Sequence, residues 1–170
     1  MVQTQNRAFN SRRSTRAAVL QVLSEVDCVA HTLDDVLSYR RESQELSPMA
    51  DEFLTRMTEG VLENIYELDK IITEFAPSWP VSHMSVIDRN LLRMAIYEMT
   101  MRNDTPPKVA INEAVELAKV FGSESSPRFV NGVLGSVMET LLSKPPSPIT
   151  ISDDTEVLQW QRYWIGYRKL

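Results

Sequence analysis

Apolar residues recur at helical spacing along most of this chain. The first apolar face has the spacing i, i+3, i+4, i+7 and predicts a helix that Ser14 or Thr15 caps. Its members are Val19, Val22, Leu23 and Val26. A second, short helix is expected over residues 33–42. No useful strand alternation occurs in the first 144 residues, so the pattern predicts an all-α fold.

The longest apolar face follows Ser47-Pro48, a strong signal for the start of a helix. It predicts one long helix that ends before Pro77. Its apolar positions are Phe53, Met57, Val61, Ile65, Leu68 and Ile72. Gly60 interrupts this helix, and an interior glycine costs about 1 kcal/mol relative to alanine. We therefore expect another helix to cross closely at Gly60.

Three more helices are expected in the second half. The first opens with a capping box from Ser85 to Asp88 and ends at the segment 103–107, which contains two prolines. The next ends at Gly122 as its C-cap, and the last starts at Ser126-Pro127. About six or seven helices with short connections predict a helical bundle. Arg93 and Glu113, on adjacent helices, are predicted to form a partly buried ion pair.

Composition agrees with a folded helical domain. Of 170 residues, 43% are hydrophobic and 24% charged, which is too apolar for disorder and too charged for a membrane protein. The single Cys28 excludes an intramolecular disulfide. The N-terminus lacks the apolar stretch of a secretory signal, and no run approaches the roughly 20 apolar residues of a membrane span. A cytoplasmic protein is expected.

Charge is distributed unevenly. The net charge is −5, yet residues 1–24 contain four arginines and no acid, which leaves −9 on the rest of the chain. These arginines are Arg7, Arg12, Arg13 and Arg16. Such asymmetry indicates a basic arm that meets an anion, although a solubilising tail fits the charge equally well.

Catalytic chemistry is not indicated. His31 and His83 are isolated, and Cys28 with His31 supplies only two possible metal ligands. The chain has neither a Walker pattern nor a dinucleotide fingerprint. Gly132 and Gly135 have the spacing of a GxxG clamp but lie within an apolar helical face, where packing explains them better. We predict no catalytic residue, no cofactor and no metal.

The chain divides into three parts by composition. Residues 1–11 form a basic arm, residues 12–144 the helical domain, and residues 145–170 a proline-rich linker with an aromatic extension. The extension holds Trp160, Tyr163, Trp164 and Tyr167, and is too aromatic for a plain disordered tail. Packing on the domain is the first expectation for it.

Three segments of the second half carry distinctive patterns: VIDRNLLRMAIYE over 86–98, VAINEAVELAK over 109–119 and SPRFVNGVL over 126–134. They follow an arginine-rich first helix. Together these segments resemble the transcription antitermination factor NusB family, over about residues 11–142. The resemblance implies a seven-helix, all-α fold in two subbundles and a non-enzymatic RNA-binding factor.

Proteins of this family pair with the ribosomal protein NusE and bind single-stranded boxA RNA. They then join the RNA polymerase antitermination complex with other Nus factors, notably during ribosomal RNA synthesis. The resemblance implies RNA-binding positions at Arg12, Arg13, Arg16, Lys108, Ser126, Arg128 and Phe129. Arginine–phosphate contacts give salt-sensitive affinity, and an aromatic side chain offers bases a stacking surface. By its spacing alone, Phe129 fits a core position equally well.

A basic ribosomal partner fits the acidic remainder of the chain. The candidates for this contact are Glu98, Glu116, Glu124 and Ser125. The chain departs from the family pattern at Ser24, Ser125, Gly135 and His83-Met84, which affects the partner contact more than the fold. Some members of the family self-associate, so a homodimer is also possible.

Two rival interpretations stay open. NusB-like domains also precede RNA cytosine methyltransferases, but this chain lacks the glycine-rich loop and the cofactor domain of such enzymes. The other rival is a helical protein-interaction module that does not bind RNA, in which the arginines form only a tail.

Overall fold

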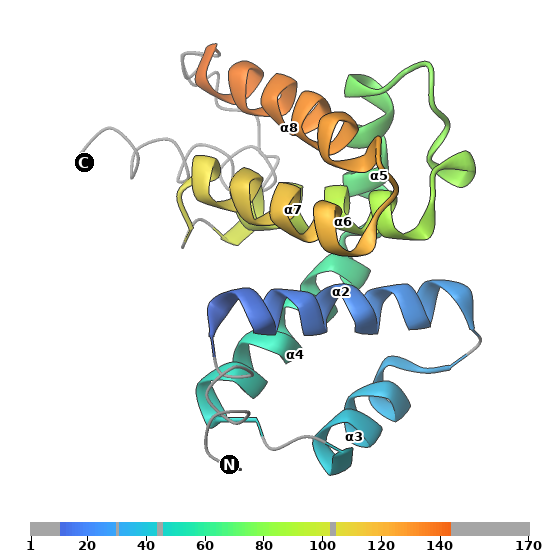
Figure 1. Cartoon of the computed structure of the whole chain (residues 1–170), viewed down its shortest axis with the longest axis vertical. Coiled ribbons are helices and arrows are strands. Elements are labelled where there is room, and N and C mark those ends of the chain that lie inside the picture. Colours follow the sequence, from blue (N-terminus) through green and yellow to red (C-terminus); the bar gives the residue numbers. More distant parts are fainter. Residues whose placement is uncertain (1–10, 30, 44–45, 103–104, 144–170) are drawn as a thin grey trace, which may run out of the picture.

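The computed structural model describes residues 11–29, 31–43, 46–102 and 105–143. Within these ranges it contains seven α-helices and no strand (Figure 1), which confirms the predicted fold class. The helices are α2 (Arg12–Cys28), α3 (Leu33–Ser43), α4 (Pro48–Glu63), α5 (Ile65–Phe75), α6 (Val86–Tyr97), α7 (Pro107–Phe121) and α8 (Ser126–Ser143). The expected arm before Ser11 and the extension 145–170 lie outside the described residues.

The helices form two groups that share one core. In the first group α2 packs on α3 and α4, and in the second α6 packs on α5, α7 and α8 (Figure 1). Direct packing of α2 on α6 joins the groups. Aliphatic side chains fill the core, and those at most 1% exposed include Leu20, Leu23, Leu54, Leu92 and Ile96. None of the described helices has the length and apolar character that crossing a membrane requires.

The first helix starts earlier than predicted. Ser11 is its N-cap, because the Ser11 hydroxyl accepts a hydrogen bond from the backbone N–H of Ser14 at 3.1 Å. The prediction that Ser14 or Thr15 caps this helix is therefore wrong. The earlier start brings the arginine cluster into the first two turns. Two other predicted caps are confirmed, Ser47 for α4 and Ser85 for α6.

The predicted long helix is in fact two helices, because the chain turns at Asn64. Its backbone angles, φ −107° and ψ 15°, leave the helical range, and its Nδ2 donates to the carbonyl oxygen of Gly60 at 2.8 Å. The same carbonyl also accepts the backbone N–H of Asn64 at 3.3 Å, so Asn64 closes the last turn of α4 with two hydrogen bonds. The expected close crossing at Gly60 is confirmed, since a Cβ there would lie 1.9 Å from Tyr97 Oη.

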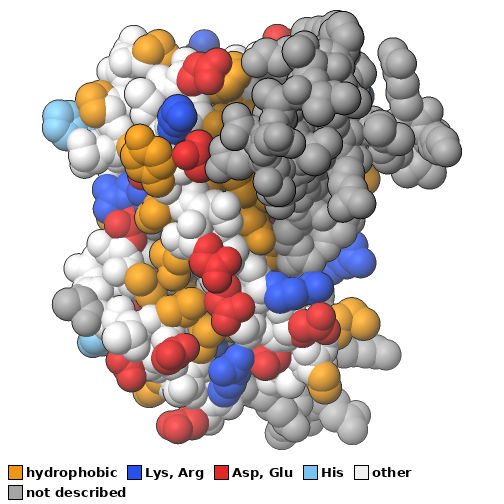
Figure 2. Space-filling view, turned by 180° about the vertical axis from the view of Figure 1, so that it is seen from behind, with side chains coloured by type: hydrophobic (Ala, Val, Ile, Leu, Met, Phe, Trp, Pro, Cys, Tyr) orange, Lys and Arg blue, Asp and Glu red, His pale blue; other side chains and the backbone are white. Residues whose placement is uncertain are grey.

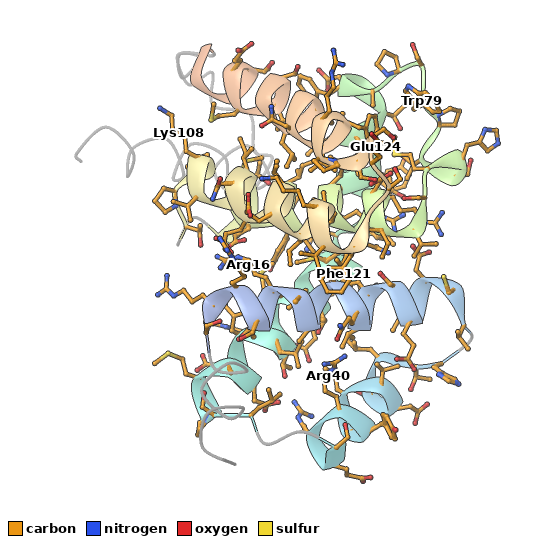
Figure 3. The ribbon with its side chains drawn as sticks, viewed as in Figure 1. Arg16, Arg40, Trp79, Lys108, Phe121 and Glu124 are labelled. Carbon is orange, nitrogen blue, oxygen red and sulfur yellow. The ribbon has the colours of Figure 1, made fainter. Side chains whose placement is uncertain are left out.

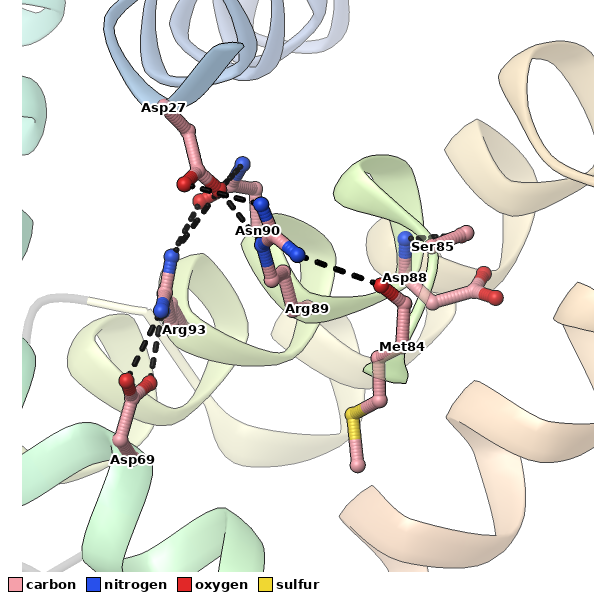
Figure 4. A network of polar contacts seen from close by, with 8 residues as sticks. All are labelled: Asp27, Asp69, Met84, Ser85, Asp88, Arg89, Asn90 and Arg93. Carbon is pink, nitrogen blue, oxygen red and sulfur yellow. Dashed lines mark hydrogen bonds and ion pairs between the residues drawn. The ribbon is translucent and has the colours of Figure 1, made fainter. Parts of the chain in front are cut away.

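A partly buried polar network links α2, α5 and α6 (Figure 4). Arg93, whose side chain is 7% exposed, donates from Nε and Nη2 to Asp69 at 2.7 and 2.8 Å and from Nη1 to Asp27 at 3.2 Å. Arg89 also donates to Asp27, at 2.7 Å. The predicted pair of Arg93 with Glu113 is wrong, because Glu113 pairs with an arginine of α2 instead.

Glycines near α8 have different surroundings. A Cβ at Gly132 or Gly135 would meet nothing within 4 Å among the described residues, so the packing expected of this pair has no counterpart in that part of the chain. Gly122 is confirmed as the C-cap of α7, with φ −91°. A Cβ at Gly122 would lie 2.5 Å from Ser126 Cβ, so crowding, not a left-handed backbone, favours glycine.

Candidate nucleic-acid interface

The start of α2 presents two of its three arginines to solvent. Arg12 and Arg13 lie in the first turn and are exposed, whereas Arg16, one turn later, is 4% exposed. Cations near a helix N-terminus oppose the helix dipole, so this placement is unfavourable for the isolated helix. The three arginines predicted as one anion-binding set therefore have different environments.

Arg16 is held inside the protein by Glu98. Its Nε donates to Glu98 Oε2 at 3.0 Å and its Nη2 donates to Glu98 Oε1, while the Thr105 hydroxyl donates to Oε1 at 2.6 Å. The Arg16 guanidinium also lies 5.4 Å from the centre of the Phe53 ring, a cation–π contact. Glu98 is 2% exposed. The expected direct contacts of Arg16 with RNA and of Glu98 with a partner are corrected, because both groups are buried against each other.

A π-helical turn places Glu98. The turn η2 (Glu98–Arg102) directly continues α6, and the sequence pattern did not predict it. π turns within helices are rare and frequent at functional sites. Here the turn begins at Glu98, whose carboxylate binds Arg16 of α2. The turn therefore helps to hold the N-terminal end of α2 in place.

Arg13 forms an ion pair at the surface, with Glu113 of α7. Its Nη2 lies 2.8 Å from Glu113 Oε1 and its Nε lies 3.2 Å from Oε2, so the contact is bidentate. The side chains are 56% and 14% exposed. The hydrogen bond from Arg13, reinforced by its charge, lowers the pKa of Glu113, and the same bond raises the pKa of Arg13.

Lys108 and Glu116 occupy the same helix as Glu113. Lys108 is exposed in the first turn of α7, and its side chain points away from α2 (Figure 3). Glu116 is half-buried and accepts a hydrogen bond from Lys119 at 2.5 Å, which lowers the pKa of Glu116. Part of its charge is therefore neutralised within the chain.

The turn between α7 and α8 carries most of the remaining candidates. Glu124, Ser125 and Arg128 are exposed. Ser126 is 1% exposed, and its hydroxyl accepts from the backbone N–H of Ser123 at 2.9 Å. The expected contact of Ser126 with RNA is corrected, because its hydroxyl is used inside the turn.

Phe129 is half-buried and pairs with Trp79. Their ring centres are 6.3 Å apart at 66°, an edge-to-face contact. Trp79, in the loop before α6, remains 59% exposed (Figure 3). Sequence reasoning missed Trp79, although an aromatic residue between Pro77 and Pro80 in a loop was a usable signal. Phe129 therefore packs on the core, as its spacing suggested, and also contacts the exposed ring of Trp79.

The candidates do not form one cluster. Arg12 and Arg13 lie at the start of α2 and Lys108 at the start of α7, whereas Arg128 and Phe129 lie in the first turn of α8, where Phe129 contacts Trp79. A helix rises 1.5 Å per residue, and Glu113, which contacts Arg13, lies eight residues before the end of α7, so about 12 Å of helix separates the Arg13 contact from that end. A ligand that contacts both Arg13 and Phe129 must be extended.

Acidic side chains are more widespread than the candidates suggested. Figure 2 shows them scattered among apolar and basic side chains over the face opposite to that of Figure 1. Exposed acids on α3 and α4 include Asp34, Asp35, Glu52, Glu59 and Glu63. No metal site is found in the described part of the chain. His31 Nδ1 lies 3.1 Å from Glu25 Oε1, and no group of three metal-ligating side chains occurs among the described residues.

Comparison with known proteins matches this helical body. The model of the NusB family matches residues 13–139. Transcription antitermination protein NusB of Dehalococcoides mccartyi (strain CBDB1) is 50% identical over 131 residues, which are 77% of this chain and 92% of that protein.

Two solved structures are also similar. T. maritima NusB is 34% identical with a TM-score of 0.69, and the match covers 76% of this chain and 92% of that one. A structure of antitermination factors NusB and NusE in complex with dsRNA is 22% identical with a TM-score of 0.69, covering 76% and 96%. At that identity the second likeness shows the fold alone.

Proposed function

This chain belongs to the NusB family of transcription antitermination proteins, and from that premise we propose that it binds single-stranded boxA-type RNA together with the ribosomal protein NusE. The family role is that of a non-enzymatic transcription factor. The proposed complex joins RNA polymerase and other Nus factors during ribosomal RNA synthesis, and a cytoplasmic location goes with that role.

One observation carries the RNA proposal: Arg12 and Arg13 are exposed at the start of a helix whose end is anchored from inside by Arg16 and Glu98. Guanidinium groups bind phosphate in a planar, bidentate way and give affinity that weakens with salt. An anchored helix end presents these groups with little loss of conformational entropy on binding. Lys108 is a further exposed cation, at the start of α7.

Trp79, Phe129 and Arg128 supply the second part of the proposed RNA surface. Unpaired bases stack on aromatic side chains, and each stacked base contributes about 1–3 kcal/mol. Trp79 offers an exposed ring that Phe129 supports from its edge. An RNA strand that lies along α7 would reach from the arginines to this aromatic pair.

For the protein partner we propose Glu124, Ser125 and Glu116, since the first two are exposed and Glu116 is partly so. A basic ribosomal protein is attracted by acidic groups of this kind. The related solved structure that contains NusB, NusE and dsRNA supports such a partner. A homodimer is a further possibility, which light scattering of the purified protein tests.

The first experiment is fluorescence anisotropy of a labelled boxA-type RNA at two salt concentrations, with and without NusE from the same organism. We expect salt-sensitive binding that NusE strengthens. Changing Arg12 and Arg13 to Ala should weaken binding and reduce the salt slope by roughly 0.7 for each phosphate that the protein no longer neutralises. Arg56→Ala is the matched control, because Arg56 is exposed on α4 and pairs only along its own helix with Glu52 among the described residues.

The rival functions predict different results. A helical protein-interaction module would bind NusE but no RNA, and the double arginine variant would then match the Arg56→Ala control. Phe129→Leu and Trp79→Leu test the aromatic part of the surface independently of the arginines, because each keeps an apolar side chain and removes an aromatic ring. Equal RNA affinity in both variants and in the unaltered protein would contradict the aromatic part of the proposal.

A further inference from the structure

Glu113 binds the guanidinium of Arg13, an exposed arginine of the proposed RNA surface. Its two carboxylate oxygens accept hydrogen bonds from Arg13 Nε at 3.2 Å and from Arg13 Nη2 at 2.8 Å. A nucleic-acid phosphate engages a guanidinium through the same kind of two-point contact. The Nε–Nη2 edge of Arg13, one of the two edges that can make such a contact, is therefore already filled by an anion of the protein itself.

The other two arginines of α2 differ from Arg13 in this respect. Arg16 is also bidentate, but it is buried, so its partner Glu98 does not compete with solvent-borne anions. Arg12 is exposed, and among the described residues no carboxylate lies within ion-pair distance of its guanidinium. Only Arg13 combines an exposed guanidinium with a carboxylate bound to it.

Burial makes the two members of the pair unequal. The Glu113 side chain is 14% exposed and the Arg13 side chain 56% exposed. The Glu113 carboxylate is therefore less accessible to solvent than the guanidinium that binds it. An incoming phosphate meets Arg13 first, but it also meets the negative charge directly behind it.

We propose that Glu113 is an internal competitor of RNA phosphate, which must be exchanged from Arg13 when RNA binds and which thereby limits affinity for RNA. This inference rests on the proposed RNA-binding function and adds regulation of the same surface. In this exchange no covalent bond changes. Arg13 stops donating two hydrogen bonds to the Glu113 carboxylate and donates them to a phosphate instead. If the protein alone binds RNA weakly, stable binding of RNA depends on a protein partner.

The test measures Kd for a fluorescein-labelled 12-nucleotide boxA-type RNA and for an oligouridine of equal length. Glu113→Gln keeps the shape of the side chain and removes its charge. We expect it to bind both RNAs about threefold to tenfold more tightly and with a steeper salt dependence. Glu67→Gln on α5 is the matched control, because it removes the same charge from an exposed pair, with Lys70.

A double-mutant cycle assigns the effect to this pair. In an Arg13→Ala background, Glu113→Gln should change RNA affinity no more than Glu67→Gln does. Weaker binding by Glu113→Gln alone would overturn the proposal, because it would mean that Glu113 positions Arg13 for RNA. Unchanged binding would overturn it as well.

A second measurement uses the unaltered protein and does not depend on the variant folding. The carboxyl carbon of Glu113, followed by NMR, reports its pKa in the free protein and with the 12-nucleotide RNA. Exchange predicts that RNA raises the pKa of Glu113, because the carboxylate loses the hydrogen bonds from Arg13 and gains a phosphate neighbour. An unchanged pKa in saturated complex would overturn the exchange. Absence of RNA binding by every form would instead overturn the proposed function, and this inference with it.

Discussion

Arg16 and Glu98, 82 residues apart, form a buried bidentate ion pair that joins the start of α2 to the π turn after α6. Thr105 completes it with a hydrogen bond to Glu98. Both side chains are at most 5% exposed. The pair therefore ties together the two groups of helices directly below the exposed arginines.

Breaking this pair should destabilise the fold strongly. Glu98→Gln keeps the side-chain shape but leaves the Arg16 charge buried without a counter-ion, and we expect a loss of about 3–5 kcal/mol in the free energy of unfolding. Urea unfolding measures it. Replacing both residues, with Arg16→Met and Glu98→Leu, should recover much of the loss. A double variant as unstable as the single one would contradict this account.

Arg93→Met should also lower stability, because Arg93 partners Asp69 and Asp27 in the network of Figure 4. The aspartates are 32% and 22% exposed, so water screens part of the effect, and we expect a loss of about 2–3 kcal/mol. Arg56→Met, which removes an exposed pair, should change stability by less than about 0.5 kcal/mol. Similar losses in both variants would show that burial of the network is unimportant.

Two glycine-to-alanine changes should have opposite signs. Gly60→Ala places a Cβ against the Tyr97 ring, and the forced shift should cost about 1–3 kcal/mol. The Cβ of Gly132→Ala meets nothing within 4 Å among the described residues, and the change should stabilise the helix by about 0.5–1 kcal/mol. Thermal melting compares them. Destabilisation by Gly132→Ala would indicate a contact beyond the described residues.

Acid should weaken the fold through Asp27. Burial by itself would raise the pKa of Asp27, but hydrogen bonds from Arg89 and Asn90 and the charges of Arg89 and Arg93 outweigh it, so the pKa lies below its ordinary value of 3.8. The carboxylate therefore stabilises the fold above pH 3.8, and this contribution is lost as the pH falls through the lowered pKa.

The corresponding experiment compares the unfolding temperature of the unaltered protein and of Arg89→Gln from about pH 6 to about pH 3. Without the Arg89 hydrogen bond the pKa of Asp27 is less depressed, so the variant should lose less additional stability on acidification. Parallel pH curves for the two proteins would show that Asp27 does not carry the predicted linkage.

Local signals were sufficient for most helix boundaries. Ser47-Pro48, Ser85 and Gly122 act within one helical turn, and the structure places them as caps. The error at the start of α2 has the same local origin, since Ser11 and Ser14 are both good caps and only the hydrogen bond distinguishes them. The break at Asn64 was missed because the apolar spacing continues across it.

Ion-pair partners that lie far apart in the sequence could not be predicted from the pattern of residues. The sequence predicts a pair between Arg93 and Glu113 because they lie on adjacent helices. In the structure Arg93 instead pairs with Asp69 and Asp27. Glu113 pairs with Arg13. Charged side chains of one type are interchangeable in a sequence, and only the distances between helices select among them.

The sequence by itself determined the helical class, the family and the set of candidates from which a site is built, because apolar period, capping and motif order are local properties of the chain. The tertiary structure alone decided that Arg16 is an anchor, that Arg13 already holds an anion and that Trp79 joins Phe129. These roles depend on which side chains the packing of α2, α6 and α7 brings within hydrogen-bond or ring-contact distance.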